Sequence, residues 1–196
     1  MRQHLYWLVL FASFFGYSYT PEEGDIVFHT SLSAQSQAVQ AATGSQYSHM
    51  GIVLFLSGQP FVFEAVQPVK YTPLQRWLDR GKNRHYVVKR LKSPLSKMAV
   101  ARLHNMAEQY EGKPYDLTFE WSDDKLYCSE LVWKLYKAAA DIELAPLEKL
   151  GSFNLAHPAV KSKLAERYGN TVPVNEAVIS PVAIFNSEFL QTIAER

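Results

Sequence analysis

Two apolar runs joined by a short polar connection constrain the fold of this chain most. The runs are His49–Leu56 (HMGIVLFL) and Pro60–Val66 (PFVFEAV), and the connection is Ser57-Gly58-Gln59. Runs of this length, rich in β-branched and aromatic residues and separated by a glycine-containing turn, are typical of two adjacent antiparallel strands. The sequence therefore predicts a buried hairpin, and with it an antiparallel sheet.

Further strands and helices are predicted around this hairpin. A glycine turn leads into a short strand over 24–29, and another strand is expected over 86–91. Helical spacing and stop or cap residues predict four helices: 33–43 ended by Gly44, 73–79 opened by Thr72, 96–110 closed by Gly112, and 128–140. The chain after Pro146 mixes short polar pieces with prolines, and no element is predicted there.

Size and charge favour one compact domain that does not bind nucleic acid. The 196 residues are 47% hydrophobic and 13% aromatic, which suits a chain that buries a single core. Twenty Lys and Arg balance nineteen Asp and Glu, and the basic runs do not exceed two residues, as in Lys89-Arg90. A nucleic-acid site would then need a patch assembled by folding from scattered residues.

The N-terminus has the layout of a secretory signal peptide. A cationic Met1–His4 precedes an apolar Leu5–Phe15, and the small or polar Gly16-Tyr17-Ser18 follows. We expect cleavage after Ser18, a single mature domain over 19–196 and export to the periplasm. An uncleaved anchor is the weaker alternative, because the apolar run is short for a membrane span. We expect no stable membrane span in the mature protein.

Cys128 is the only cysteine, so the chain cannot form an intramolecular disulfide. A lone cysteine is often a small buried apolar residue, and this reading is the alternative to a functional thiol. However, Cys128 falls in the first turn of the predicted helix 128–140, where the helix dipole favours a negatively charged thiolate. A nucleophilic role would also require a base.

Of the six histidines, His49 is placed best to act as that base. It begins an apolar strand, which would hold its ring rigidly at the strand end beside the core. His29 and His85 lie at the ends of other predicted strands and are ordinary alternatives. The remaining three are not expected to be catalytic: His4 lies in the predicted signal segment, and His104 and His157 have no nucleophilic side chain beside them in sequence.

Glu64 is a carboxylate inside an otherwise apolar strand, and a buried charge requires a partner. With the hairpin centred near Gly58, the midpoint between positions 49 and 64 falls close to that centre, so Glu64 would lie close to opposite His49. It could then accept a hydrogen bond from one ring nitrogen and leave the other for the thiol. The alternative is a glutamate on an edge strand that faces water.

At these residues the sequence resembles the NlpC/P60 superfamily of papain-like hydrolases, in its permuted branch, and more closely the bacterial YiiX-like proteins. The resemblance covers nearly the whole mature chain. Five motifs in order support it: Gly24-Asp25-Ile26-Val27-Phe28, Tyr47-Ser48-His49-Met50-Gly51-Ile52-Val53, Val62-Phe63-Glu64-Ala65-Val66, Gly112-Lys113-Pro114-Tyr115-Asp116 and Tyr127-Cys128-Ser129-Glu130-Leu131-Val132.

The resemblance implies an α+β fold of circularly permuted papain type, with an antiparallel sheet packed against the helix that carries the nucleophile. It implies that Cys128 attacks a carbonyl, that His49 moves the proton and that Glu64 orients His49. Tyr115 would help to hold the oxyanion together with the Cys128 backbone N–H. Glu64 stands where many relatives carry His, Asn or Gln, which changes the charge at that position.

Three functions follow as hypotheses. The first is a cysteine hydrolase, an amidase or peptidase acting on cell-wall peptide material through a thioester. The second is a lipid acyl hydrolase or acyltransferase, which would need an apolar channel near Cys128. Eight aromatic residues could line such a channel or could simply form core: Phe28, Phe55, Phe61, Phe63, Tyr71, Trp77, Phe119 and Trp121. The third is a ligand-binding or scaffolding protein without turnover.

The expected partners are small peptide or lipid substrates of the cell envelope, and the oligomeric state is left open. We expect neither a cofactor nor a metal, because the cysteine and the histidines show no close-spaced ligand pair of zinc type. The loop 112–125 is a candidate for a lid over the site.

Overall fold

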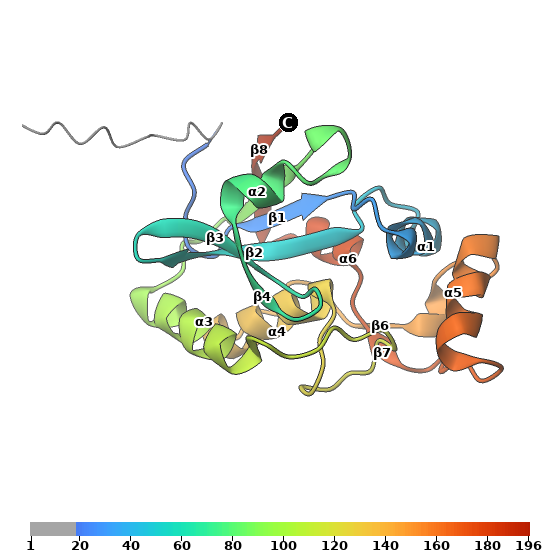
Figure 1. The fold of residues 1–196 in the computed structure, drawn as a ribbon. Coiled ribbons are helices and arrows are strands. Elements are labelled where there is room, and N and C mark those ends of the chain that lie inside the picture. The colour runs from blue at the N-terminus through green and yellow to red at the C-terminus, as the bar shows by residue number, and fades with distance from the viewer. Residues whose placement is uncertain (1–18) are drawn as a thin grey trace, which may run out of the picture.

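The computed structural model describes residues 19–196, so the predicted signal peptide lies outside the described residues. Within residues 19–196 the main sheet has six strands in the order β4-β3-β2-β1-β5-β8, and every neighbouring pair is antiparallel (Figure 1). Its strands are β1 (Ile26–His29), β2 (His49–Leu56), β3 (Gln59–Glu64), β4 (Lys70–Pro73), β5 (Val87–Leu91) and β8 (Leu190–Glu195). The predicted hairpin is therefore present as β2 and β3.

Helices cover both faces of this sheet. α3 (Lys97–Tyr110) and α4 (Cys128–Ala140) lie on one face, and the short α2 (Leu74–Leu78) lies on the other (Figure 1). Successive side chains of a strand point to opposite faces, so each central strand contributes to two clusters. Ile26 and Phe28 of β1 pack in the cluster with α4, whereas Val27 packs in the cluster with Trp77 of α2.

The remaining elements are α1, which forms as predicted, and C-terminal pieces that the sequence did not predict. α1 (Ala34–Thr43) begins after Ser33, whose side chain accepts from the Ser36 N–H, and it ends at Gly44 in the left-handed conformation. The C-terminal pieces are β6 (Glu148–Lys149), α5 (Pro158–Tyr168), β7 (Ala177–Val178), α6 (Pro181–Phe185) and β8. α5 packs against α1 at one end of the molecule (Figure 1).

The hairpin is centred near Gly58, as predicted, but His49 and Glu64 are not directly opposite each other. Ile52 pairs with Phe63 and Leu56 with Gln59, so the centre lies between residues 57 and 58. The strand partner of His49 is His29 of β1 rather than Glu64. In this register Glu64 lies two positions from the point opposite His49, and the two side chains share a face of the sheet as diagonal neighbours, because side chains alternate with a period of two.

The predicted cap of helix α2 is also wrong. Thr72 lies in β4, and its hydroxyl donates to Glu64 Oε1 at 2.7 Å instead of capping the helix. α2 begins after Pro73 without a side-chain cap. No helix within residues 19–196 combines the length and the apolar character needed to cross a membrane.

Candidate active site

Cys128 begins α4 and is nearly buried, with 5% of its surface exposed. The first turn of this helix is held from two sides. Glu130 accepts a hydrogen bond from the Tyr127 N–H, and the Ile179 backbone bonds with both the Ser129 hydroxyl and the Tyr127 hydroxyl. The thiol therefore sits at a fixed helix N-terminus, where unpaired N–H groups favour negative charge.

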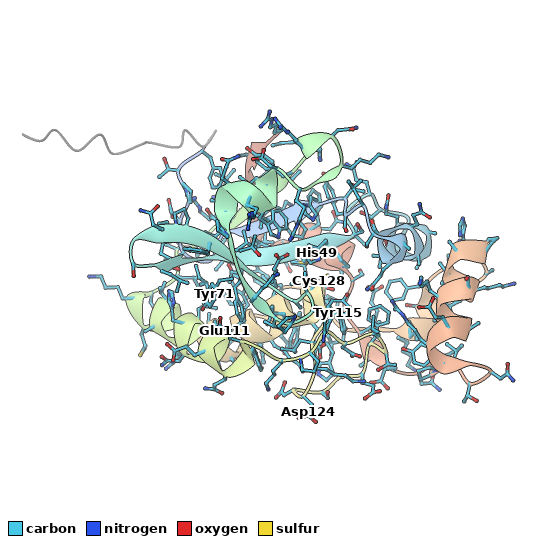
Figure 2. All side chains as sticks on the ribbon, viewed as in Figure 1. His49, Tyr71, Glu111, Tyr115, Asp124 and Cys128 are labelled. Carbon is cyan, nitrogen blue, oxygen red and sulfur yellow. The ribbon has the colours of Figure 1, made fainter. Side chains whose placement is uncertain are left out.

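His49 joins the thiol to a carboxylate. Its Nε2 lies 2.6 Å from Glu64 Oε2, which leaves Nδ1 for the interaction with Cys128. Figure 2 shows His49, Cys128 and Tyr115 next to one another. Burial lowers the pKa of His49, but hydrogen bonding and charge from Cys128 and Glu64 outweigh it and raise the pKa to about 9. At neutral pH the protonated His49 therefore places a positive charge beside the sulfur.

Glu64 is completely buried and receives four hydrogen bonds from described residues. His49 Nε2, Trp77 Nε1 at 2.9 Å and Arg80 Nη2 at 2.5 Å reach Oε2, while Thr72 reaches Oε1. Burial alone would raise the pKa of Glu64, yet the bonds and charges of His49 and Arg80 hold it well below its usual range. Glu64 is therefore an ionised, immobile partner for His49.

Tyr115 lies in the loop between α3 and α4 and contacts α1. Gln35 Nε2 donates to its hydroxyl at 2.7 Å, and the Tyr115 N–H donates to Gln67 Oε1 at 2.7 Å. Burial and the charge of Cys128 raise the pKa of Tyr115 well above its usual range. The phenol is therefore neutral. Its hydroxyl accepts from Gln35, so the hydroxyl proton is available for a hydrogen bond near Cys128.

The other described histidines take different places. His29 stacks on Trp77 with ring centroids 4.1 Å apart and lies 5.3 Å from the His49 ring. Burial, with the nearby charges of His49 and Arg80, lowers the pKa of His29 to about 2, so it stays neutral. Three lie outside this cluster: His85 pairs with Glu195, His104 with Glu23, and His157 caps α5.

Two hollows meet at this cluster. One is an apolar cavity of about 100 Å³ between α1, α5 and the first turn of α4, and Cys128 lies in its wall. The other is a cleft of about 570 Å³, and His49 lies in its wall. Three residues line both: Gln35, Ser48 and Tyr115. The junction between the two hollows is therefore where a bond could lie against both the thiol and the imidazole.

Most of the aromatic residues considered as a possible channel lining do not line the cavity. Of the eight aromatic residues considered, all of which the structure describes, Phe119 alone lines the apolar cavity. Phe28, Phe63 and Trp77 are fully buried core residues. Aliphatic residues of α1 and α5 such as Val39 and Leu164 form the wall instead, and α5 comes from the part of the sequence that predicted no element.

Comparison with known proteins places the chain in a family. The family described as "Permuted papain-like amidase enzyme, YaeF/YiiX, C92 family" matches residues 20–194. The chain belongs to this C92 family. It is 45% identical over 195 residues to YiiX of Escherichia coli (strain K12). The aligned region covers 100% of this chain and 96% of that protein.

The C92 fold is also seen in a solved relative. The chain is similar to the crystal structure of metalloprotein yiiX from Escherichia coli O157:H7, with a TM-score of 0.86 and 47% identity. That match covers 90% of this chain and 98% of the solved one. The permuted papain-like fold and the YiiX-like resemblance inferred from the sequence are thus confirmed, and the chain is of the cysteine hydrolase kind.

The solved relative is described as a metalloprotein, which raises the question of a metal site in this chain. Residues 19–196 contain no group of three or more His, Cys, Asp or Glu side chains that could hold a metal ion. Glu64, the carboxylate beside His49, already accepts four hydrogen bonds and is paired with Arg80. The residues of this cluster therefore do not fit a metal site.

Three residues around Glu64 were missed by sequence reasoning. Trp77 and Arg80 come from α2 and the turn after it, and Thr72 from β4. An available signal was the need of a buried carboxylate for several donors, which Thr72, Trp77 and Arg80 could supply from the chain just after the hairpin. The sequence carried no pattern that would show which of the neighbouring polar residues face Glu64.

Proposed function

We propose that this protein is an exported cysteine amidase that cleaves an amide in material of the cell envelope, using Cys128, His49 and Glu64 as a catalytic triad. The observation that supports the proposal most is the position of His49. One of its ring nitrogens is bound by the buried, ionised Glu64, and the other side of the ring interacts with the thiol at the N-terminus of α4. This is the arrangement that nucleophilic catalysis by cysteine requires.

The reaction proceeds in two halves. The Cys128 thiolate attacks the carbonyl carbon of the amide, and the resulting oxyanion accepts hydrogen bonds from the Cys128 N–H and the Tyr115 hydroxyl. The protonated His49 gives its proton to the amine nitrogen, the C–N bond breaks, and a thioester remains. Water then adds to the thioester while His49 takes its proton, and the acid leaves as the thiolate is restored.

The apolar cavity favours a second candidate function, a lipid acyl hydrolase or acyltransferase that uses the same thioester. Cys128 lies in the wall of this cavity, and Val160 and Leu164 of α5 with Ala38 and Val39 of α1 form much of the rest. An apolar acyl group could occupy this space while its carbonyl lies at the thiol. In an acyltransferase, an amine or alcohol would replace the water in the second half.

Trapping of the thioester tests the proposal. The purified protein is mixed with p-nitrophenyl hexanoate, quenched in acid and measured by intact mass, and the variants Cys128→Ser and His49→Ala are treated in parallel. We expect a hexanoyl mass on Cys128 that disappears on incubation in wild type and does not form in Cys128→Ser. Release of p-nitrophenol at the same rate in wild type and Cys128→Ser would overturn the proposal.

A panel of amides then separates the candidates. Amides of cell-wall peptides and amides of hexanoic acid are compared by the rate of amine release, with an added amine acceptor in half of the samples. Faster release from the peptide favours the envelope amidase, and faster release from the hexanoyl amide favours the lipid acyl hydrolase. Transfer of the acyl group to the added amine, at the expense of free acid, favours the acyltransferase.

A further inference from the structure

The two hollows, which share Gln35, Ser48 and Tyr115 in their walls, have different chemistry, and the direction of the reaction assigns one to each half of the substrate. His49 must give its proton to the departing amine, so the amine half lies in the cleft that His49 lines. The acyl half then lies on the side of the apolar cavity that Cys128 lines. This assignment rests on the proposed amidase function.

The described lining of the cleft contains a permanent positive charge and no carboxylate. Among the described residues that line it, Arg80 is the permanently charged side chain, and no Asp or Glu is present. Glu64, which pairs with Arg80, is fully buried behind the wall. The first turn of α1 also contributes Ser33 and Ser36 to the cleft, so the positive end of this helix dipole faces the same space.

Arg80 has donors left for a ligand. Its Nη2 reaches Glu64, and 41% of its side chain is exposed. A guanidinium has five N–H donors in a planar fork, so the pair with Glu64 leaves most of the fork available. His49 and Arg80 bind the same oxygen, Glu64 Oε2, at 2.6 and 2.5 Å, which fixes the guanidinium about 5 Å or less from the ring nitrogen Nε2.

We propose that the cleft binds an anionic group on the amine half of the substrate, with Arg80 as its anchor. The substrate class is then an amide between an apolar acyl group and an amine that carries a carboxylate or a phosphate, as in an N-acyl amino acid or an N-acylated phosphoethanolamine. His29 in the cleft wall is neutral, so the positive charge near this site comes from Arg80 and from the protonated His49.

Matched substrates test the proposal. N-hexanoyl-alanine is compared with N-hexanoyl-alaninamide, which differs in replacing the carboxylate by a neutral amide, and kcat/KM is measured for both. The ratio of the two values is the readout, because any effect of Arg80 through Glu64 and His49 falls on both substrates alike. N-hexanoyl-phosphoethanolamine against N-hexanoyl-ethanolamine repeats the comparison for phosphate and distinguishes the two sources of the anion.

We expect wild type to favour the anionic partner of at least one pair by about tenfold, because a charge-assisted hydrogen bond to a half-exposed guanidinium is worth on the order of tenfold in affinity. Arg80→Gln should reduce that preference to near unity, and Arg80→Lys should retain part of it. Arg84→Gln is the matched control, since Arg84 is more exposed and lies outside the cleft lining, and it should keep the wild-type ratio.

Failure of the cleft and failure of the amidase give different results. If wild type hydrolyses p-nitrophenyl hexanoate but shows no preference in either pair, or if Arg80→Gln keeps the preference, the anion site is refuted while the cysteine hydrolase stands. If no substrate is turned over, binding of the same pairs to Cys128→Ala by calorimetry replaces the kinetic ratio. Equal binding of acid and amide in both pairs would then refute the cleft independently of catalysis.

Discussion

Replacement of Glu64 by glutamine is the sharpest test of the charge arrangement around His49. Glutamine keeps the shape of the side chain, and its oxygen can still face His49, Trp77 and Arg80 while its amide faces the Thr72 hydroxyl, which can accept. The change therefore removes mainly the negative charge. Without that charge, the protonated form of His49 loses its buried partner, and the pKa of His49 falls from about 9 toward its ordinary value of 6.5.

The magnitude follows from the pKa of His49. A rise from 6.5 to about 9 corresponds to roughly 3 kcal/mol, at about 1.4 kcal/mol for each pKa unit. Cys128 and Glu64 both contribute to this rise, so we assign about half of it to Glu64 and expect Glu64→Gln to lower the free energy of unfolding by about 2 kcal/mol at pH 6.5.

The sign of the pH dependence is fixed by the direction of the shift. A raised histidine pKa stabilises the folded state fully below pH 6.5, and that stabilisation is lost as pH rises through about 9. Urea unfolding of wild type and Glu64→Gln at pH 6.5 and at pH 9.5, under reducing conditions, measures the difference. A destabilisation that is equal at the two pH values would refute the charge pairing, and so would its absence at pH 6.5.

Three further predictions concern the thiol, the hairpin and the oxyanion. Because His49 remains protonated up to about pH 9, iodoacetamide should alkylate Cys128 rapidly at pH 6 to 7, and His49→Ala should slow this reaction about tenfold or more. Equal alkylation rates in wild type and His49→Ala would refute activation of the thiol by His49. Gly51→Ala should lower the free energy of unfolding by about 2 to 4 kcal/mol in urea, because a Cβ there would lie 2.4 Å from a Val62 methyl and 2.9 Å from a backbone oxygen. A free energy of unfolding close to that of wild type would show that the strands move apart easily. Tyr115→Phe should lower kcat for thioester formation by about tenfold to a hundredfold while leaving the alkylation rate of Cys128 unchanged, and an unchanged kcat would exclude its hydroxyl from the oxyanion site.

Local patterns in the sequence were sufficient to predict the hairpin and the long helices. The apolar runs at 49–56 and 60–66 became β2 and β3, and helical spacing located α3 and α4 within a residue or two. These signals are strong because both strands are buried and because a helix that packs on a sheet repeats its apolar positions. The pairing of His49 with Glu64 follows from the same logic of a buried charge that requires a partner.

The exact register could be predicted only to within a residue or two. The connection is a two-residue turn in which Ser57 and Gly58 both have positive φ, at 49° and 76°. Positive φ is expected for glycine but is uncommon for serine, so the sequence did not identify this two-residue turn, and a centre near Gly58 left it open whether Glu64 lies opposite His49 or diagonal to it. The result for Glu64 was nevertheless similar, because diagonal neighbours share a face of the sheet.

The remaining parts of the site depend on packing between distant segments. Arg80 and Trp77 reach Glu64 because α2 folds back over the sheet, and α5 forms the apolar cavity because it packs on α1. The strand β8 is an edge strand with mostly exposed side chains, so it lacks the apolar alternation that would identify it. No local pattern in the sequence predicts these contacts between distant segments.

The clamp on the first turn of α4 has a consequence for biosynthesis. Ile179, which bonds to Ser129 and Tyr127, follows Cys128 by about fifty residues, and the hairpin with His49 and Glu64 precedes it. A ribosome therefore delivers His49 and Glu64 first, Cys128 next and Ile179 last. The arrangement on which the proposed nucleophile depends can form only when nearly the whole polypeptide has been made.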